Sequence, residues 1–396
     1  MNLYSYSLMS KQTRQLTTFK NVDVNWPSLG PDSIVFENGG YLYVFDLKTE
    51  KATKLTVYLA GDRDLARPHW ANVSKFATDF DISPEGKRAV FTARGDVYTV
   101  PAKEGSVRNL TRTPGVREKY ATWSPDGKWI AYLSDRTGED EIYLAPQDGM
   151  GKETRVTTDG KVFRLPLAWS PDSKKLLFAD KSTRLFLVEI ETKKPVLIDQ
   201  GKYGEITDYG WSPDSKWVAY AKEAENQQGV IYLYALENQK ITPVTTSFHD
   251  SFNPAFDPEG KYLYFLSNRD YNEVIGVYDF EFANPKATRV FVVTLRADLP
   301  SPFAPQSDES GAKKPETPTP PKEEAKAEAK TEGREVPKDF RIDLAGIGDR
   351  VVALAIPPAR MRNLQAAKDL VIYATSPIEG LAGPCPGKRR PFTPTT

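Results

Sequence analysis

The stretch Trp123-Ser124-Pro125-Asp126-Gly127-Lys128 decides the fold, because it returns with little change along the chain. Two close copies share its Trp-Ser-Pro-Asp core, and three looser copies keep an aromatic residue before a proline-bearing turn. The other copies are Trp26-Pro27-Ser28-Leu29-Gly30-Pro31-Asp32-Ser33, Phe80-Asp81-Ile82-Ser83-Pro84-Glu85-Gly86-Lys87, Trp169-Ser170-Pro171-Asp172-Ser173-Lys174, Trp211-Ser212-Pro213-Asp214-Ser215-Lys216 and Phe256-Asp257-Pro258-Glu259-Gly260-Lys261. A short unit that recurs in this way indicates a repeat architecture.

The turn prolines are almost evenly spaced. They stand at positions 31, 84, 125, 171, 213 and 258, so successive copies are 53, 41, 46, 42 and 45 residues apart. One four-stranded blade of a β-propeller occupies roughly 40–50 residues. The spacing therefore predicts an all-β protein made of four-stranded propeller blades, with an insertion at residues 61–75 lengthening the first interval.

Each copy has the composition of a tight hairpin turn. Proline presets φ near −65°, Asp or Glu bonds the nearby backbone, and Gly or Ser follows where a left-handed residue is needed. Apolar strands follow the turns, as at residues 129–132, and more polar outer strands close the units, as at residues 108–111. The regularly spaced carboxylates are explained by the turns, so we predict neither a metal site nor a cofactor. They are Glu85, Asp126, Asp172, Asp214 and Glu259.

Composition excludes several classes of function. Lys plus Arg equals Asp plus Glu at 53 each, so the chain lacks the basic excess of nucleic-acid-binding proteins. It has no run of about 18 apolar residues to span a membrane, and its only cysteine is Cys385. We expect a cytoplasmic protein without a nucleic-acid or membrane partner; a signal peptide preceding Met1 would instead indicate the periplasm.

Changes in composition predict five segments. Residues 298–337 are rich in Pro, Lys, Glu and Ala and have little apolar surface to bury, so they are expected to be a flexible insertion. Strand-like sequence resumes at residues 340–343 and again at 351–356. The predicted organisation is terminal strands of a preceding propeller at 1–20, blades one to six at 22–297, the insertion at 298–337, a seventh blade at 338–379 and a disordered or unrelated tail at 380–396.

A family resemblance accompanies the repeats. It is carried by Val35-Phe36-Glu37-Asn38-Gly39-Gly40-Tyr41-Leu42-Tyr43, by Arg94-Gly95-Asp96-Val97-Tyr98-Thr99-Val100-Pro101-Ala102-Lys103 and by Pro300-Ser301-Pro302-Phe303-Ala304-Pro305. The interval from Leu3 to Tyr373 resembles the propeller region of tricorn protease and its homologues. That resemblance implies a six-bladed propeller ending at residue 20, then a seven-bladed one, as parts of a homo-oligomeric serine peptidase that degrades oligopeptides.

No catalytic residue is predicted in this chain. The family's catalytic Ser, His and Glu follow the propellers, beyond the region of resemblance. The residues give the same answer, because the chain has only His69 and His249 and no Gly-x-Ser-x-Gly elbow. We expect both histidines to have structural or solvent roles in loops. Whether the chain belongs to an enzyme is therefore left open by its residues.

The candidate site is the mouth of the propeller's central channel. Loops that join an outer strand to the next inner strand, and a second strand to a third, gather at one end of a propeller, where binding residues are common. Arginine binds carboxylates through paired hydrogen bonds. The candidates that could line a peptide channel are Arg94, Arg117, Arg136, Arg164 and Arg269, beside the acidic Glu118, Glu205 and Asp250.

Two readings of these arginines and two functions remain open. Arg136 and Arg269 could simply satisfy hairpin ends. The chain could be the substrate-gating propeller of a tricorn-like peptidase, with oligopeptides as partners. Alternatively, it could be a non-catalytic protein-binding platform like TolB, whose propeller shares the turn repeat.

Overall fold

Nearly all regular structure in the described part of the chain is β-strand, which confirms the predicted all-β class. The computed structural model describes residues 1–58, 60–61, 71–271, 273–275, 282–284, 286–303, 337 and 339–377. Short 3-10 turns occur at Ser74–Phe76 and Ile347–Arg350. The chain divides into two compact units, Met1–Ala71 and Asn72–Thr396.

The first unit contains one four-stranded sheet and one hairpin. The sheet consists of β3 (Val24–Leu29), β4 (Ser33–Asn38), β5 (Tyr41–Asp46) and β6 (Lys51–Lys54), and the hairpin of β1 (Tyr4–Tyr6) and β2 (Thr13–Gln15). Leu3, next to the hairpin, is buried with Val24, Phe36 and Phe45 of the sheet. Leu3, within residues 1–20 that we expected to end another propeller, thus shares a core with the sheet β3–β6.

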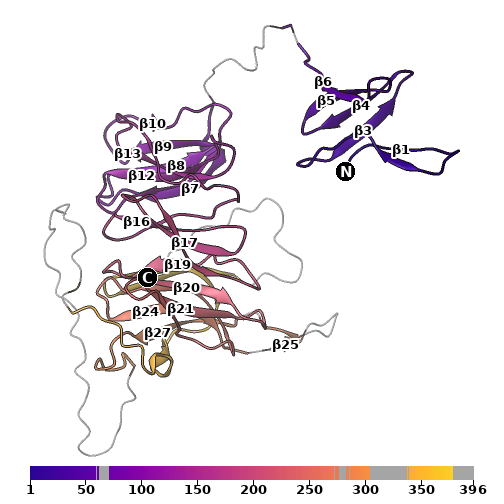
Figure 1. The fold of residues 1–396 in the computed structure, drawn as a ribbon. Helices are drawn as coiled ribbons and strands as arrows, with labels where there is room; N and C mark the ends of the chain where they lie inside the picture. The colour runs from indigo at the N-terminus through magenta and orange to yellow at the C-terminus, as the bar shows by residue number, and fades with distance from the viewer. Residues whose placement is uncertain are drawn as a thin grey trace, which may run out of the picture. The chain divides into compact units, whose positions relative to one another are not determined.

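The second unit is a succession of antiparallel four-stranded sheets (Figure 1), as predicted from the repeat. We call each sheet a blade and name it by its first strand. The first four blades are β7 (Ala77–Ile82), β8 (Arg88–Ala93), β9 (Asp96–Pro101) and β10 (Arg108–Asn109); β11 (Glu118–Trp123), β12 (Trp129–Ser134), β13 (Glu141–Pro146) and β14 (Thr154–Arg155); β15 (Ala168–Trp169), β16 (Lys175–Ala179), β17 (Arg184–Glu189) and β18 (Pro195–Gln200); and β19 (Tyr209–Trp211), β20 (Trp217–Glu223), β21 (Gly229–Ala235) and β22 (Lys240–Pro243).

The β23 blade is completed by a strand that is distant in sequence. It contains β23 (Asp250–Phe256), β24 (Tyr262–Asn268), β27 (Thr288–Thr294) and β28 (Val351–Ala353), and the small hairpin β25 (Val274–Ile275) and β26 (Phe282–Ala283) lies between β24 and β27 in sequence. We expected residues 351–356 to open a seventh blade. Instead, Val351 pairs with Val293, and the preceding Ile347 is buried in the core of the β23 blade.

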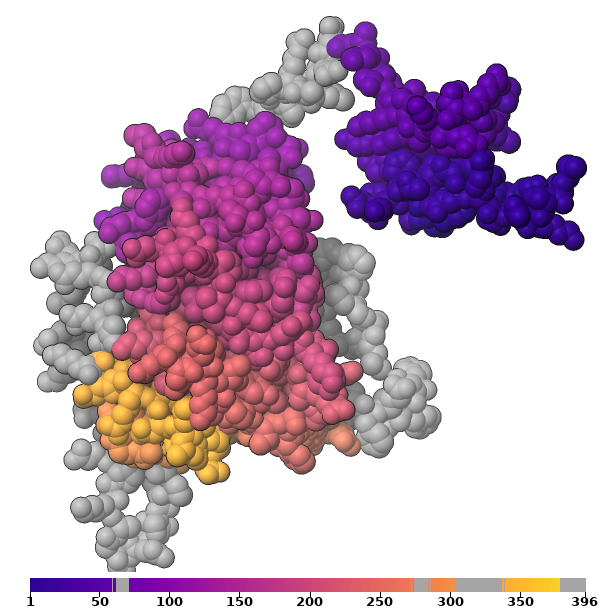
Figure 2. Space-filling model, viewed as in Figure 1, coloured from indigo at the N-terminus to yellow at the C-terminus, as the bar shows by residue number. Residues whose placement is uncertain are grey.

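A second hairpin follows this blade. Strands β29 (Arg360–Ala367) and β30 (Leu370–Ser376) form a two-stranded sheet, and Met361 and Leu364 of β29 are buried with Leu266 and Val290 of the β23 blade. In Figure 2, this yellow segment lies against the orange part of the chain. Only this part of segment 338–379 remains a candidate for a seventh blade. Most of the predicted insertion at 298–337 and all of the tail at 380–396 lie outside the described residues.

The repeated turns also join neighbouring blades. Ser173 and Ser215 occupy the left-handed position of their turns, with φ of 58° and 59°. The Ser173 hydroxyl accepts a hydrogen bond from the Asp126 amide at 3.0 Å, and that of Ser215 accepts one from the Asp172 amide at 3.1 Å. Serine at the glycine position of a turn thus gains a hydrogen bond to the preceding blade.

Side chains link the first strands of successive blades into one wall. We call β7, β11, β15, β19, β23 and β29 the inner wall. Two buried tryptophans donate their indole N–H groups to the preceding blade, and acidic or amide side chains accept backbone N–H groups from the next blade. The indole N–H groups of Trp169 and Trp211 donate to the backbone oxygens of Thr122 at 3.4 Å and Ala168 at 3.1 Å. The backbone N–H groups of Trp123, Asn253 and Leu364 donate to the side-chain oxygens of Asp81 at 2.8 Å, Asp208 at 2.9 Å and Asn253 at 2.7 Å, respectively.

Candidate functional site

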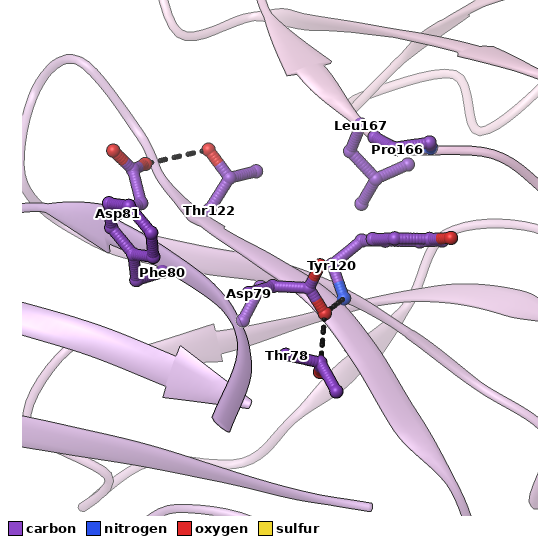
Figure 3. A pocket seen from close by; sticks show the side chains of 9 residues that line it. Thr78, Asp79, Phe80, Asp81, Tyr120, Thr122, Pro166 and Leu167 are labelled. Carbon is purple, nitrogen blue, oxygen red and sulfur yellow. Dashed lines mark hydrogen bonds between the residues drawn. The ribbon is translucent and has the colours of Figure 1, made fainter. Parts of the chain in front are cut away.

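A hollow of about 390 Å³ lies along the inner wall. Its lining comes from β7, from β11 and from the segment just before β15, so three successive blades contribute to it (Figure 3). The lining residues are Thr78, Asp79, Phe80, Asp81, Tyr120, Ala121, Thr122, Pro166 and Leu167. The hollow therefore combines carboxylate, hydroxyl and apolar groups on the first strands of the blades.

A β-bulge shapes the hollow. The pairing of β11 with β12 shifts between Lys119 and Thr122, and Tyr120 within the bulge has a φ of 54°. Bulges bend a strand and re-aim its side chains. Asp79 accepts a hydrogen bond from Thr92 at 2.6 Å and a longer one from the Tyr120 amide at 3.4 Å. The carboxylate of one blade thereby supports the bulge of the next.

The hollow presents an aromatic ring to solvent. Phe80 on β7 has 75% of its surface exposed, and Ile82 on the same strand has 60% exposed. On the same strand, the Asp81 carboxylate accepts hydrogen bonds from the Thr122 hydroxyl and the Trp123 amide, both at 2.8 Å. The acidic groups of the hollow are thus held by neighbouring blades, while Phe80 is available for contact.

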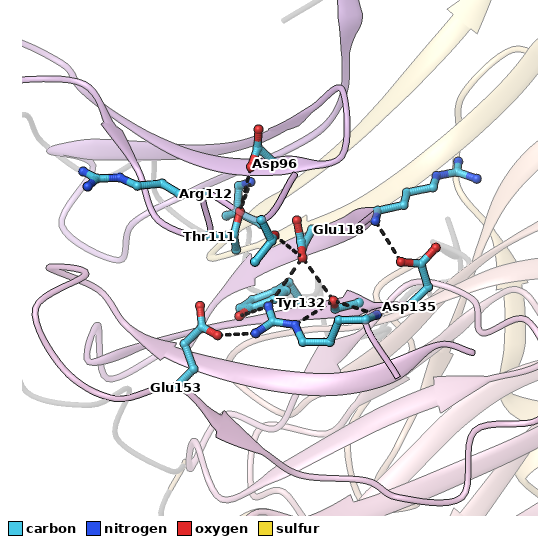
Figure 4. Close-up of polar contacts among 12 residues, drawn as sticks. Asp96, Thr111, Arg112, Glu118, Tyr132, Asp135 and Glu153 are labelled. Carbon is cyan, nitrogen blue, oxygen red and sulfur yellow. Dashed lines mark hydrogen bonds and ion pairs between the residues drawn. The ribbon is translucent and has the colours of Figure 1, made fainter. Parts of the chain in front are cut away.

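A buried carboxyl group lies at the start of β11 (Figure 4). One oxygen of Glu118 accepts hydrogen bonds from Thr113 at 2.8 Å and Ser134 at 3.0 Å, and the other has no hydrogen-bond partner among the described residues. Burial raises the pKa of Glu118 despite these hydrogen bonds and the nearby Arg136. Arg136 itself pairs with Glu153 and donates a hydrogen bond to the Tyr132 hydroxyl oxygen at 3.1 Å.

A second ionic cluster joins the β11 and β15 blades. The ammonium group of Lys119 lies 2.7 Å from the Asp140 carboxylate and 3.0 Å from the centre of the Phe163 ring. Asp140 also accepts the backbone N–H of Arg164 at 2.8 Å. Burial lowers the pKa of Lys119, and Asp140 opposes that effect. Because these groups are buried and come from both blades, the cluster stabilises the contact between the β11 and β15 blades.

The five predicted arginines do not form one group. Arg94 and Arg117 are exposed, and Arg94 occupies a two-residue turn with Gly95 in which both φ angles are positive. Arg164 is buried, and its guanidinium group pairs with Asp159 at 2.7 Å. Arg136 is mostly buried and paired, and Arg269 is half-buried. Of the five, only Arg94 and Arg117 are exposed, as expected at a channel mouth, and the Arg94 guanidinium lies 5.6 Å from the centre of the Phe76 ring.

Two of these arginines donate hydrogen bonds at hairpin ends. The Nε–H groups of Arg136 and Arg269 donate to Ser134 and Ser267, each at 3.0 Å, two residues earlier. Ser134 is the last residue of β12, and Ser267 is the last but one of β24. The equal geometry shows that the two arginines occupy the same position in different blades.

Sequence reasoning missed the residues that hold the inner wall together. Asp79, the third residue of β7, and Asp208, which immediately precedes β19, were not singled out. Adjacent ionisable residues at Glu118 and Lys119, at the start of an otherwise apolar strand, were the available signal. Of the two histidines, His249 lies in the loop before β23, as expected, and His69 lies outside the described residues.

The described residues offer neither a metal site nor a membrane-spanning helix. Within the described ranges, no group of three His, Cys, Asp or Glu side chains is placed to hold a metal ion. No helix among these residues is long and apolar enough to cross a membrane.

Comparisons with known proteins agree with the blade architecture. Residues 77–391 match the family model described as Tricorn protease second beta propeller domain. Tricorn protease homolog 1 of Streptomyces coelicolor is 29% identical over 356 residues, which cover 88% of this chain and 32% of that protein. The tricorn protease homolog of Saccharolobus solfataricus is 28% identical over 382 residues, which cover 96% of this chain and 32% of that protein.

A solved structure shows the same fold. The crystal structure of the tricorn protease matches with a TM-score of 0.64 at 22% identity, covering 96% of this chain and 34% of that chain. The present chain therefore spans about a third of the length of the relatives it matches.

Proposed function

This chain belongs to the family of tricorn protease second β-propeller domains, and we propose that it is the substrate-gating propeller of a tricorn-like serine peptidase. In this role, the inner wall admits oligopeptides toward catalytic residues that this chain does not supply. The parent enzyme is proposed to be a cytoplasmic homo-oligomer that degrades oligopeptides.

The observation that carries the proposal is the hollow on the inner wall. An extended peptide offers backbone N–H and C=O groups together with side chains of varied polarity. The hollow offers carboxylates at Asp79 and Asp81 and an exposed ring at Phe80. A mixed lining of this kind suits many peptide sequences, because it neither excludes polar groups nor rewards only apolar ones.

The exposed arginines support the admission of peptides. Arg94 lies in the turn between β8 and β9, and Arg117 immediately precedes β11. Charges at a concave opening raise the local concentration of an oppositely charged ligand. Salt screens exposed charges over about 8 Å at physiological ionic strength. We therefore propose that these two residues accelerate the arrival of peptide carboxylates.

Photo-cross-linking tests the proposal directly on this chain. A peptide of about ten residues carrying a benzophenone side chain is irradiated with the protein, and mass spectrometry maps the adducts. We expect adducts within residues 77–82 and 118–122, and a severalfold loss with Phe80→Ser. The matched control is Val107→Ser, which removes an exposed apolar side chain just before the outer strand β10 of the same blade.

The outcome separates the two candidate functions. Adducts spread over the outer strands, or an unchanged yield with Phe80→Ser, would contradict a peptide path along the inner wall. If the peptide gives no adducts but a folded protein that carries the same benzophenone group does, the TolB-like binding platform is favoured.

A further inference from the structure

A cation over a pair of stacked rings recurs in the blades. In the β11, β15, β19 and β23 blades, an aromatic residue of the second strand stacks on its direct partner in the third strand, and a basic side chain lies over one ring. The pairs are Tyr132 with Tyr143, Phe178 with Phe186, Tyr220 with Tyr232 and Phe265 with Phe291. The cations are Arg136, Arg184, Lys222 and Arg269, at 4.3, 5.2, 4.8 and 4.2 Å from the ring centres.

Three of these four cations have a carboxylate partner. Arg136 pairs with Glu153 at 2.5 Å, Arg184 with Asp180 at 2.6 Å and Lys222 with Asp199 at 2.5 Å. A guanidinium or ammonium group that is partly removed from water needs such a partner, because burial penalises its charge. The repeated unit of these blades is therefore two rings, a cation and an acid.

Arg269 departs from this unit. It has no carboxylate partner in the part of the chain that the structure describes, although it is half-buried and lies as close to its ring as the others. The neighbouring acids are engaged elsewhere, since Asp270 pairs with Arg289 at 2.7 Å and Asp250 accepts a hydrogen bond from Asn268 at 2.8 Å. Burial lowers the pKa of Arg269, as expected for a guanidinium group without an anion.

Two exposed aromatic rings lie against His249, whose imidazole feels the charge of Arg269. Phe248 and Tyr271 are 80% and 60% exposed, and both lie against the His249 ring, at 4.7 and 6.4 Å between ring centres. The Nδ1 atom of His249 is buried without a hydrogen-bond partner among the described residues. Burial and the charge of Arg269 lower the pKa of His249, so its ring is neutral near pH 7 and adds no second charge.

We propose that Arg269, His249, Phe248 and Tyr271 form a niche for the C-terminal carboxylate of a peptide that ends in an apolar residue. The ligand carboxylate takes the place that Glu153, Asp180 and Asp199 fill in the other blades. The last side chain of the peptide contacts the rings of Phe248 and Tyr271. The proposal rests on the proposed peptide-admitting function and assigns its recognition element to the β23 blade.

Histidine resonances provide a local readout, because the whole chain has only His69 and His249. The full chain is titrated with N-acetyl-Ala-Ala-Phe as the free acid, with the same tripeptide as its C-terminal amide, and with free phenylalanine. A His249→Gln variant assigns the signal. We expect the free acid to shift the His249 resonance, the amide to leave it unchanged, and free phenylalanine to bind more weakly because its ammonium group meets Arg269.

Variants identify the groups responsible. Arg269→Gln is expected to weaken binding of the acid by about tenfold or more, since it removes a charge-assisted hydrogen bond. Phe248→Ser, at an exposed position that should not affect folding, is expected to weaken it severalfold. Arg108→Gln on the outer strand β10 matches the change in net charge and is expected to leave binding unchanged.

Three results would overturn the niche. These are equal shifts by acid and amide, no shift at millimolar concentrations of either peptide, or binding that Phe248→Ser leaves unchanged. Stronger binding of free phenylalanine than of the tripeptide acid would assign the niche to amino acids. If the benzophenone peptide still reacts with the inner wall in any of these cases, the gating function stands and only the niche is rejected.

Discussion

Replacement of Lys119 by methionine tests the cluster that joins the β11 and β15 blades. Its ammonium group and the Asp140 carboxylate have side-chain exposures of 6% and 7% and lie 2.7 Å apart. Lys119→Met keeps most of the volume but leaves the Asp140 charge buried without its partner. Breaking a buried ion pair in this way costs about 3–5 kcal/mol.

The remaining hydrogen bond limits the loss, because Asp140 still accepts the Arg164 amide N–H in the variant. We therefore expect Lys119→Met to lower the free energy of unfolding by about 3–4 kcal/mol. The double variant Lys119→Met/Asp140→Asn should recover to within about 1 kcal/mol of the parent chain.

Urea unfolding followed by circular dichroism measures these differences. Lys128→Met is the control, because the exposed Lys128 lies 3.6 Å from Asp126 at the surface and its loss should cost under about 1 kcal/mol. A loss below about 1 kcal/mol for Lys119→Met, or a double variant as unstable as Lys119→Met, would refute the assignment of a buried ion pair.

Further predictions concern single sites. Burial raises the pKa of Glu118, so the folded state loses stability as the pH rises and this carboxyl group ionises. Glu118→Gln should therefore gain stability relative to the parent as the pH rises, measured by urea unfolding between pH 5 and 8. Gly95→Ala places a Cβ 2.9 Å from the Val116 carbonyl oxygen at a φ of 87° and should cost more than about 1 kcal/mol, whereas Gly115→Ala, with open space at a φ of 80°, should lose less in thermal melts. Arg117→Glu should slow peptide association at low salt in stopped-flow mixing without loss of stability, and equal rates would return Arg117 to a structural role. The purified chain should not hydrolyse fluorogenic tripeptides, and turnover blocked by a serine-directed inhibitor would contradict this.

The features predictable from sequence were local ones. The Ser-Pro-Asp turns depend on residues within a few positions of each other, so their composition specifies the hairpins that the structure contains. The hydroxyl of Ser124 accepts the Trp129 amide at 2.9 Å inside the turn, a bond that spacing alone makes possible. Strand type and order within most blades follow from the same short-range pattern.

Contacts between distant segments could not be predicted in this way. Val351–Ala353 pairs with β27 although more than fifty residues separate them. The sequence of an apolar strand does not specify which other strand it pairs with. Arg117 and Arg164 both precede a first strand, yet one is exposed and the other is buried with Asp159 and Glu141. That difference depends on which acids the fold brings beside each arginine.

Repetition gives a physical reason to look for function where blades differ. A group that recurs in several blades, such as the Trp indole that donates to the preceding blade from the β15 and β19 blades, is accounted for by the packing that these blades share. A departure from the repeat has no such explanation, and a destabilising one needs a separate benefit. Arg269 lacks the acid that stabilises its counterparts, while Phe248, which lies against His249, exposes an apolar ring. Both departures become favourable only when an apolar anion binds, which is why we place peptide recognition there and not at the paired Arg136 or Arg164.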